Sequence, residues 1–539
     1  MLLSLLMVVC LTFIGIVCPA GACLHRPTER VIIVGAGAAG LAAASALSGY
    51  ASLLILEAQE RLGGRVNTNR SLGIPIELGA AWIHRADGNI VSELAEQFGC
   101  STFVSENKRL AVHDEEGAPY DAGVTERVYS LLSTRLMPQL LRQRSRLRAD
   151  GRDDVSLGVL MARLPEVSTL GKAERCVLDF LLFRDIVQDH TADLWQTSAA
   201  RYDTDHYGGN GKDRVLPGGY DCVIRGLATM AATAETRTGR AGQVTLLRWT
   251  ADGIEATLAD GRVEHADRAI VTVPLGVLKA SVRESVANPA VMHGGPQDPH
   301  ASHGTGGGVH PPPLRFEPPL PTAALLAIER LGWGEALKVG LRFPRVFWPN
   351  EAHFIGKVSG GCGRLGSARH VEFLNVALYT GGVPVLLMET EREYANALAA
   401  LPDAVVIARV TDELRRMFPR TYVEPTASLV ARLGNNSFQR GGFTYMPVGT
   451  THDLQRTLAT PIANGRLLLA GEHTSDLHTG TVHGAIVSGR KAAEHAKAAM
   501  RGRDVRAGGE AYQEVYRQRL FELIYSPKDD EEKEWDRNP

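Results

Sequence analysis

The 539-residue sequence has little of several features that often define a protein class. Aromatic residues make up only 6%, and 58 Lys and Arg nearly balance 60 Asp and Glu, giving a formal net charge of −2. Without a basic excess, the chain lacks the electrostatic footprint of a nucleic-acid-binding protein, and no nucleic-acid partner is expected. Any attraction for a cationic ligand must therefore come from local groups.

Cysteine is also scarce, with seven in the whole chain. Two lie in the apolar first segment, and the other five are scattered and odd in number: Cys23, Cys100, Cys176, Cys222 and Cys362. The spacing is neither a disulfide framework nor a metal-ligand pattern, so no metal site is expected. One or two disulfides are compatible with this pattern if the protein is secreted.

Long hydrophobic runs are confined to the beginning of the chain. Residues 2–17 are almost wholly apolar, and small residues follow at 19–22. We interpret residues 1–22 as a secretory signal peptide, although no Lys or Arg precedes the apolar run. The run is short for a transmembrane helix, and a signal anchor is the alternative. We expect a protein that is secreted or lies in the secretory lumen, with no later membrane span.

The rest of the chain has the composition of a globular protein, and its organising stretch is a strand followed by a glycine turn. Residues 31–34 are Val-Ile-Ile-Val, and Gly35, Gly37 and Gly40 form a G-x-G-x-x-G pattern before an Ala-rich helix. Gly35 permits the turn, Gly37 lets a pyrophosphate approach, and Gly40 allows close helix packing. Glu57 ends a second apolar run at the position of a ribose-binding carboxylate. The alternative is a glycine-rich turn in an ordinary α/β domain.

Two further motifs follow in order. Residues 56–65 match L-E-A-x-x-R-x-G-G-R, and residues 78–84 read L-G-A-A-W-I-H. Together with the first glycine turn, they resemble the flavin-containing amine oxidases, and within them the polyamine oxidases. The resemblance extends over about residues 30 to 500. It implies an α/β fold in which an FAD-binding, Rossmann-like domain is interleaved with an α+β substrate domain.

This architecture divides the chain into segments. We expect the FAD-binding domain in three of them: residues 28–90, 205–280 and 455–500. We expect the substrate domain in the segments between: residues 91–204 and 281–454. Within the first of these substrate-domain segments, residues 128–147 read as a helix that Pro138 should kink or split. A Gly-, His- and Pro-rich stretch at 288–313 reads as a flexible insertion, and residues 501–539 as a C-terminal tail. A weak metal site is the less favoured interpretation of the four histidines in the 288–313 stretch: His293, His300, His303 and His310.

The resemblance implies FAD as the cofactor. The positions that match the family's FAD-binding residues are these: Gly35, Gly37, Ala38, Ala39, Gly40, Glu57, Ala58, Arg65, Gly79, Ala80, Ala81, Trp82, Val244, Glu472, Thr481 and Val482. Glu472 would contact the ribityl or phosphate region. Thr481 and Val482 would offer backbone N–H groups to the flavin ring, and the helix expected at 486–499 would support negative charge on it.

Lys338 lies in an alternating apolar strand, where burying an ammonium would be costly. The pattern alone does not decide between a buried lysine and a surface lysine on an edge strand. The resemblance implies that Lys338 is catalytic and holds a water near flavin N5. It also matches His84 to a histidine of animal polyamine oxidases, which could bind the amine or set its protonation.

Phe443 and Tyr445 match a segment that lines the family's substrate channel, although two core aromatic residues are an equal alternative. Asp189 and Asp193 are candidates for acids that attract a cationic substrate, but a solvated acidic loop is favoured for both. The chain departs from common family residues at three positions, so the substrate stays open: Ala336, Leu433 and Thr481.

The resemblance implies oxidation of polyamines, such as spermine, spermidine or acetylated forms. A hydride would pass from the amine carbon to the flavin, O2 would be the acceptor, and the products would be an aldehyde, an amine and H2O2. Two alternatives stay open. One is a histone-lysine demethylase-like amine oxidase, against which the signal peptide argues. The other is a non-catalytic FAD-binding protein, against which Lys338 argues.

Overall fold

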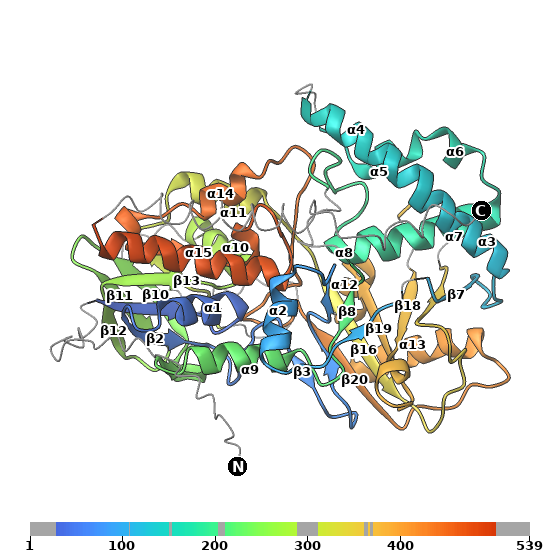
Figure 1. Cartoon of the computed structure of the whole chain (residues 1–539), viewed down its shortest axis with the longest axis horizontal. Coiled ribbons are helices and arrows are strands. Elements are labelled where there is room, and N and C mark those ends of the chain that lie inside the picture. Colours follow the sequence, from blue (N-terminus) through green and yellow to red (C-terminus); the bar gives the residue numbers. More distant parts are fainter. Residues whose placement is uncertain are drawn as a thin grey trace, which may run out of the picture.

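The computed structural model describes residues 29–502, with gaps at 107, 150–153, 203–210, 288–310, 360–364 and 367–369. The predicted signal peptide, the four histidines of the insertion and all but two residues of the tail lie outside the described residues. Figure 1 shows two parts side by side, one around strands β1 and β2 and the other around strands β16 to β20.

A parallel five-stranded sheet carries the glycine turn, with strand order β22-β13-β1-β2-β9. Its strands are β1 (Arg30–Val34), β2 (Ser52–Leu56), β9 (Glu235–Arg237), β13 (Arg268–Val271) and β22 (Leu467–Leu469). The central strands are apolar at consecutive positions because both faces of a parallel sheet are covered. Val31 and Ile33 belong to one core, whereas Ile32 and Val34 belong to the other.

Helices cover the first face of this sheet. They are α1 (Ala38–Leu47), α2 (Ile90–Gln97), α9 (Asp221–Met230) and α15 (Val482–Met500). A disulfide joins Cys100, just after α2, to Cys222 in α9. α15 begins at Val482, four residues before the predicted start, because the Thr481 hydroxyl caps it by accepting from the Gly484 N–H (3.0 Å).

The opposite face packs against a four-stranded sheet and three helices. The sheet has the order β12-β11-β10-β14. Its strands are β10 (Val244–Trp249), β11 (Ile254–Leu258), β12 (Val263–Ala266) and β14 (Arg315–Glu317). The helices are α10 (Leu275–Ala287), α11 (Thr322–Arg330) and α14 (Asp453–Leu458).

A six-stranded sheet forms the second part, with the order β20-β16-β19-β18-β17-β7. Its strands are β7 (Leu110–His113), β16 (Ala336–Arg342), β17 (Phe354–Lys357), β18 (Val371–Asn375), β19 (Val385–Glu391) and β20 (Ala427–Arg432). Helices α12 (Arg392–Ala399) and α13 (Asp403–Met417) complete its core. Because β16 pairs with both β19 and β20, Lys338 lies on an interior strand and not on an edge strand.

A helical region lies beyond this sheet. α3 (Ala122–Leu131) continues into a π-helical turn at Leu132–Leu136 and then into α4 (Met137–Ala149). The helix predicted at 128–147 is thus interrupted just before Pro138, whose ring would clash with the carbonyl one turn earlier in a regular α-helix. The region also contains α5 (Leu157–Ala162), α6 (Pro165–Ser168), α7 (Lys172–Leu182), a π-helical turn at Phe183–Val187, and α8 (Gln188–His190).

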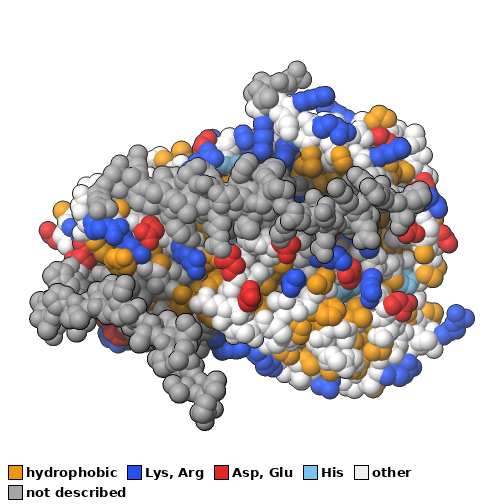
Figure 2. Space-filling model, viewed as in Figure 1, with side chains coloured by type: hydrophobic (Ala, Val, Ile, Leu, Met, Phe, Trp, Pro, Cys, Tyr) orange, Lys and Arg blue, Asp and Glu red, His pale blue; other side chains and the backbone are white. Residues whose placement is uncertain are grey.

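Short strands connect the two parts. They are β3 (Thr68–Asn69), β4 (Ile76–Glu77), β5 (Trp82–Ile83), β6 (Phe103–Val104), β8 (Arg214–Val215), β15 (Gly332–Trp333) and β21 (Thr444–Tyr445). On the face shown in Figure 2, Lys and Arg side chains gather over α4, while charges of both signs mix elsewhere. Within the described part of the chain, none of the helices is both long and apolar enough to cross a membrane.

Candidate active site

A cavity of about 740 Å³ extends from the glycine turn to β16 and the start of α15. Most of the predicted site residues line it: Gly35, Gly37, Ala38, Ala39, Glu57, Ala58, Arg65, Gly79, Ala80, Ala81, Trp82, His84, Val244, Lys338, Phe443, Glu472, Thr481 and Val482. Two predicted residues, Gly40 and Tyr445, are not among its lining residues. The fold therefore brings segments separated by hundreds of residues to one cavity.

The glycine turn leaves open space where a phosphate would lie. Gly35 has φ +104°, and a Cβ added at Gly40 would lie 1.9 Å from the Gly35 carbonyl oxygen, so Gly40 serves helix packing. A Cβ added at Gly37 would meet nothing closer than 3.9 Å. Gly37 also caps α1 without a side-chain acceptor. The first N–H groups of α1 are therefore available to an anion.

Glu57 is tied to the same turn. Its two carboxylate oxygens accept from the N–H groups of Ala36 and Gln59, each at 2.8 Å. Burial raises the pKa of Glu57, and these two hydrogen bonds oppose the rise. Since each oxygen keeps a second lone pair, Glu57 can still accept from ribose hydroxyls, as its position after β2 predicts.

A buried ion pair lies further along the cavity. Arg65 Nη1 lies 2.8 Å from Glu472 Oε1 and donates to the Gly442 carbonyl at 3.0 Å. Glu472 Oε2 accepts from the Gly480 N–H at 2.8 Å. Burial alone would raise the pKa of Glu472, but Arg65 outweighs it and the pKa is lowered. Glu472 is thus an ionised anchor for the loop that leads to Thr481.

Lys338 is almost completely buried, with 1% of its surface exposed. Its ammonium donates to the Gly79 carbonyl at 2.8 Å and forms an ion pair with Glu389 Oε2 at 3.1 Å. It also lies 5.7 Å from the centre of the Trp82 ring. The buried interpretation of Lys338 is therefore correct, and the lysine lines the cavity.

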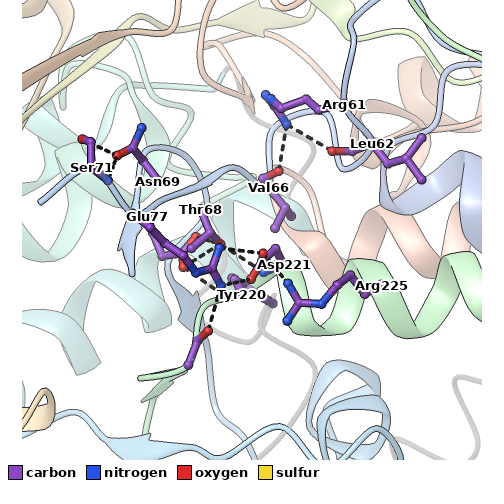
Figure 3. Close-up of polar contacts among 12 residues, drawn as sticks. Arg61, Leu62, Val66, Thr68, Asn69, Ser71, Glu77, Tyr220, Asp221 and Arg225 are labelled. Atoms are coloured by element: carbon purple, nitrogen blue, oxygen red, sulfur yellow. Dashed lines mark hydrogen bonds and ion pairs between the residues drawn. The ribbon is translucent and has the colours of Figure 1, made fainter. Parts of the chain in front are cut away.

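The strand that precedes Gly79 is held by a polar network (Figure 3). Glu77 accepts from the Thr68 hydroxyl and from the Tyr220 N–H, each at 2.9 Å. Burial raises the pKa of Glu77 to about 7, although both hydrogen bonds oppose the rise. The network joins β4 to the start of α9 and so fixes the backbone whose Gly79 carbonyl binds Lys338.

His84 pairs with an acid that the sequence did not single out. Its Nδ1 lies 3.2 Å from Asp213 Oδ2, and the Arg85 N–H donates to Asp213 Oδ1 at 2.8 Å. Burial alone would lower the pKa of His84, but the hydrogen bond and charge of Asp213 outweigh it and raise that pKa. Burial alone would raise the pKa of Asp213, but the hydrogen bonds and charges of His84 and Arg85 outweigh it and lower that pKa. His84 is thus stabilised in its protonated form.

Further acids line this end of the cavity: Asp185, Asp189, Asp213, Glu372 and Glu389. Arg184 pairs with both Asp185 and Glu372, each at 2.9 Å. Burial raises the pKa of Glu372 to about 8 and that of Asp189 to about 7. Within the described residues, the Asp189 carboxylate makes neither a hydrogen bond nor an ion pair.

Of the other substrate-binding candidates, two line the cavity and two do not. Phe443 lines the cavity, but the Tyr445 ring packs where a Cβ on Gly332 would lie, 2.5 Å from it, so Tyr445 belongs to the β15–β21 pair. Asp189 lines the cavity, whereas Asp193 does not and instead accepts from the Trp195 N–H at 3.0 Å. The three departures from common family residues also line it: Ala336, Leu433 and Thr481.

Comparison with known proteins decides the family. Residues 38–496 match the family model described as flavin containing amine oxidoreductase. The chain belongs to this family. Polyamine oxidase 3 of Oryza sativa subsp. japonica is 28% identical over 493 residues, covering 87% of this chain and 89% of the relative. Polyamine oxidase 5 of the same plant is 31% identical over 480 residues, covering 86% and 87%.

A second kind of relative is also similar. Lysine-specific histone demethylase 1 homolog 3 of the same plant is 30% identical over 483 residues, covering 87% of this chain but 54% of the relative. The protein is an FAD-dependent amine oxidase, as both the family and these relatives indicate. The alternative of a non-catalytic FAD-binding protein is therefore set aside.

The residues present in this amine oxidase fit FAD. The open turn at Gly37 and the uncapped start of α1 suit a pyrophosphate, and Glu57 retains acceptor capacity for a ribose. The N-terminus of α15 faces the same cavity and would stabilise negative charge on a bound ring. When bound, FAD supplies two-electron redox chemistry, while the protein orients the amine and the cofactor.

Sequence reasoning did not assign a role to most of the amine oxidase's cavity acids. Asp185 and Asp189 are four residues apart in a helical stretch, a spacing that places them on one face and could have indicated a pair. Glu372 and Glu389 gave no such signal, because they lie on different strands whose pairing only the fold determines.

Proposed function

We propose that this amine oxidase oxidises polyamines and uses O2 as the electron acceptor. The observation that carries the proposal is Asp189, whose carboxylate lines the cavity of the buried Lys338 and makes neither a hydrogen bond nor an ion pair with the described residues. A polyamine has several ammonium groups, so one amine can react while another stays charged and needs a counterion. The similarity to rice polyamine oxidases supports the same substrate class.

The proposed reaction begins at the carbon next to an unprotonated amine nitrogen. That carbon loses a hydride, which carries two electrons and which bound FAD would accept, and a C=N bond forms in an iminium ion. Water adds to the iminium, and the C–N bond breaks to give an aldehyde and an amine. O2 takes up the two electrons and two protons and becomes H2O2.

Two residues would act at the reacting amine. We assign His84 to bind the substrate and to take up the proton that an ammonium must lose, because Asp213 stabilises the resulting imidazolium. We assign Lys338 to hold a water. Its ammonium has three N–H donors, and Lys338 lines the cavity, where a water could accept from one of them. Phe443 would form part of the apolar wall around the substrate's methylene groups.

The test is anaerobic addition of spermine to the purified flavoprotein, followed by the flavin absorption spectrum. Bleaching by spermine, with H2O2 formed when air is admitted, is the expected result. Bleaching only by a methyl-lysine peptide would instead support a demethylase-like activity, to which the second kind of relative points. A monoamine of similar apolar size is the control, because it lacks the second charge that Asp189 would bind.

We also propose that the protein enters the secretory pathway. The apolar first segment and the disulfide between Cys100 and Cys222 support this, because structural disulfides form in oxidising compartments. The test is to express the full chain in a eukaryotic host, sequence the N-terminus of the mature protein and label its free thiols. A cytosolic protein in which Cys100 and Cys222 are both reduced would overturn this proposal.

A further inference from the structure

The ion pair of Lys338 is built into the six-stranded sheet. Lys338 on β16 lies directly opposite Glu389 on β19, and their charged groups are 3.1 Å apart. On the other side, β20 places the uncharged Ala431 opposite Lys338. Both members of the pair line the cavity. The pair therefore joins the interior of a sheet to the space where an amine would react.

A buried ammonium needs a counterion, and three acids interact with Lys338. Burial raises the pKa of Glu391 well above its usual value, and the charge of Glu389 adds to the rise. The pKa of Glu77 is about 7, and its carboxylate already accepts from Thr68 and Tyr220. Glu389 is the acid in direct ionic contact with Lys338.

We propose that Glu389 is a positioning residue that directs the Lys338 ammonium into the cavity. The proposal rests on the proposed catalytic role of Lys338. The Gly79 carbonyl fixes one side of the ammonium and Glu389 a second, which leaves an N–H for a water or ligand in the cavity. Removing the Glu389 charge leaves the buried ammonium without its ionic partner, so the Gly79 carbonyl alone would hold its position.

The chain contains a matched control for this effect. Lys357 on β17 is also 1% exposed, and its Nζ lies 3.1 Å from Glu413 Oε2 on α13. Neither Lys357 nor Glu413 lines the cavity. The two pairs therefore share burial and distance, and only the pair of Lys338 and Glu389 reaches the cavity.

The experiment compares Glu389→Gln with Glu413→Gln in the FAD-loaded full-length enzyme. Rapid mixing measures flavin reduction by spermine without air, and then reoxidation by O2, over a range of pH. Lys338→Met identifies which of the two half-reactions, flavin reduction or reoxidation, depends on Lys338. We expect Glu389→Gln to slow that half-reaction by about 10- to 100-fold and to shift the pH profile of its rate. Glu413→Gln should lower the melting temperature and leave both rates and pH profiles unchanged.

Further variants separate a positioning role from a structural one. Glu389→Asp restores the negative charge and should recover part of the rate and the original pH profile. Lys338→Met combined with Glu389→Gln should be no slower than Lys338→Met alone, because the glutamate would act only through the lysine. The double variant also removes both buried charges, so it remains measurable if Glu389→Gln alone is unstable.

The outcomes distinguish a failure of the Glu389 proposal from a failure of the catalytic role of Lys338, on which it rests. If Lys338→Met keeps both half-reaction rates, the role of Lys338 fails and the role of Glu389 with it. If Lys338→Met is slow but Glu389→Gln has the rates and pH profile of the unmodified enzyme, only the Glu389 proposal is overturned. An additive loss in the double variant would overturn it as well.

Discussion

The two ends of the cavity are built in different ways. The nucleotide end uses backbone N–H groups of one turn, from Gly35 to Ala39, with Glu57 hydrogen-bonded to the same turn. The amine end uses charged side chains from separate elements, among them Asp189, Lys338 and Glu389. A local motif can specify the first kind of site, because the backbone supplies the contacts. The second kind exists only once distant elements have packed.

The ends also differ in how their acids are balanced. At the nucleotide end, Arg65 lowers the pKa of Glu472, so that acid is ionised and neutralised within the protein. At the amine end, burial raises the pKa of Asp189 to about 7 and that of Glu372 to about 8. Glu372 already pairs with Arg184, whereas Asp189 is an acid that a bound cation could stabilise. Changes at the nucleotide end should affect cofactor retention, and changes at the amine end should affect turnover.

The largest expected effect is that of Lys338→Met at the amine end. Loss of a fixed donor beside the reacting amine should lower the rate by about 100- to 1,000-fold. FAD content, measured from the absorption spectrum, should stay at the level of the unmodified enzyme. A variant that loses its FAD instead would show that the two ends are not separable.

At the nucleotide end, we expect Glu57→Ala to weaken FAD binding by about 10- to 100-fold. The change removes the proposed acceptor of the ribose hydroxyls and also leaves the Ala36 N–H, which is buried, and the Gln59 N–H without their acceptor, at a cost of about 1–3 kcal/mol for a buried group. Equilibrium titration of the apoprotein with FAD measures the effect, and turnover at saturating FAD should change little. Glu60→Ala, at an exposed neighbouring position, is the control. Equal FAD affinity in both variants would contradict the assignment.

Asp189→Asn tests whether the amine end distinguishes polyamines from monoamines. We expect KM for spermine to rise about tenfold, equivalent to about 1.4 kcal/mol, with little change in kcat, because a distal ammonium loses its counterion. KM for a monoamine should stay the same. Asp193→Asn is the matched control outside the cavity. A similar rise in KM for the monoamine and the polyamine would show that Asp189 does not bind the second ammonium group.

The smallest expected effect is on pH-dependent stability. The raised pKa of His84 contributes stability that is full below its unfolded value of about 6.5 and is lost as pH rises through the folded pKa. The lowered pKa of Asp213 contributes stability that is full above its unfolded value of about 3.9 and is lost as pH falls through the folded pKa. The pair therefore stabilises most between these two limits.

Asp213→Asn should reduce the free energy of unfolding in that window by up to about 1 kcal/mol, because the pair is partly exposed. Melting temperatures measured across pH give the difference between the two proteins. The difference should shrink once His84 has lost its proton at higher pH. A difference that is constant at every pH would show that Asp213 acts through packing and not through the charge of His84.

The residues that sequence reasoning found and missed follow the same division. Gly37, Glu57 and Thr481 lie next to the segments that shape them, so their positions could be predicted with the family resemblance as a guide. Asp189 was present in the sequence as a weak candidate, but nothing in the pattern showed that it would be unpaired. Glu389 gave no signal, because its partner Lys338 is brought opposite it only by the pairing of β16 with β19.

The sequence by itself determined the strand, glycine turn and helix of the nucleotide end. That was possible because a buried parallel strand requires consecutive apolar residues and a tight turn near a phosphate requires glycine. The pattern placed Lys338 in an alternating apolar strand, and the family resemblance marked it as catalytic, but neither showed that this lysine was buried. It is the tertiary structure that places Lys338 inside a sheet with Glu389 as its counterion, and that places Asp189 in the same cavity without a hydrogen bond or ion pair to the described residues. The reason is that burial and charge pairing depend on the distances between elements far apart in the chain.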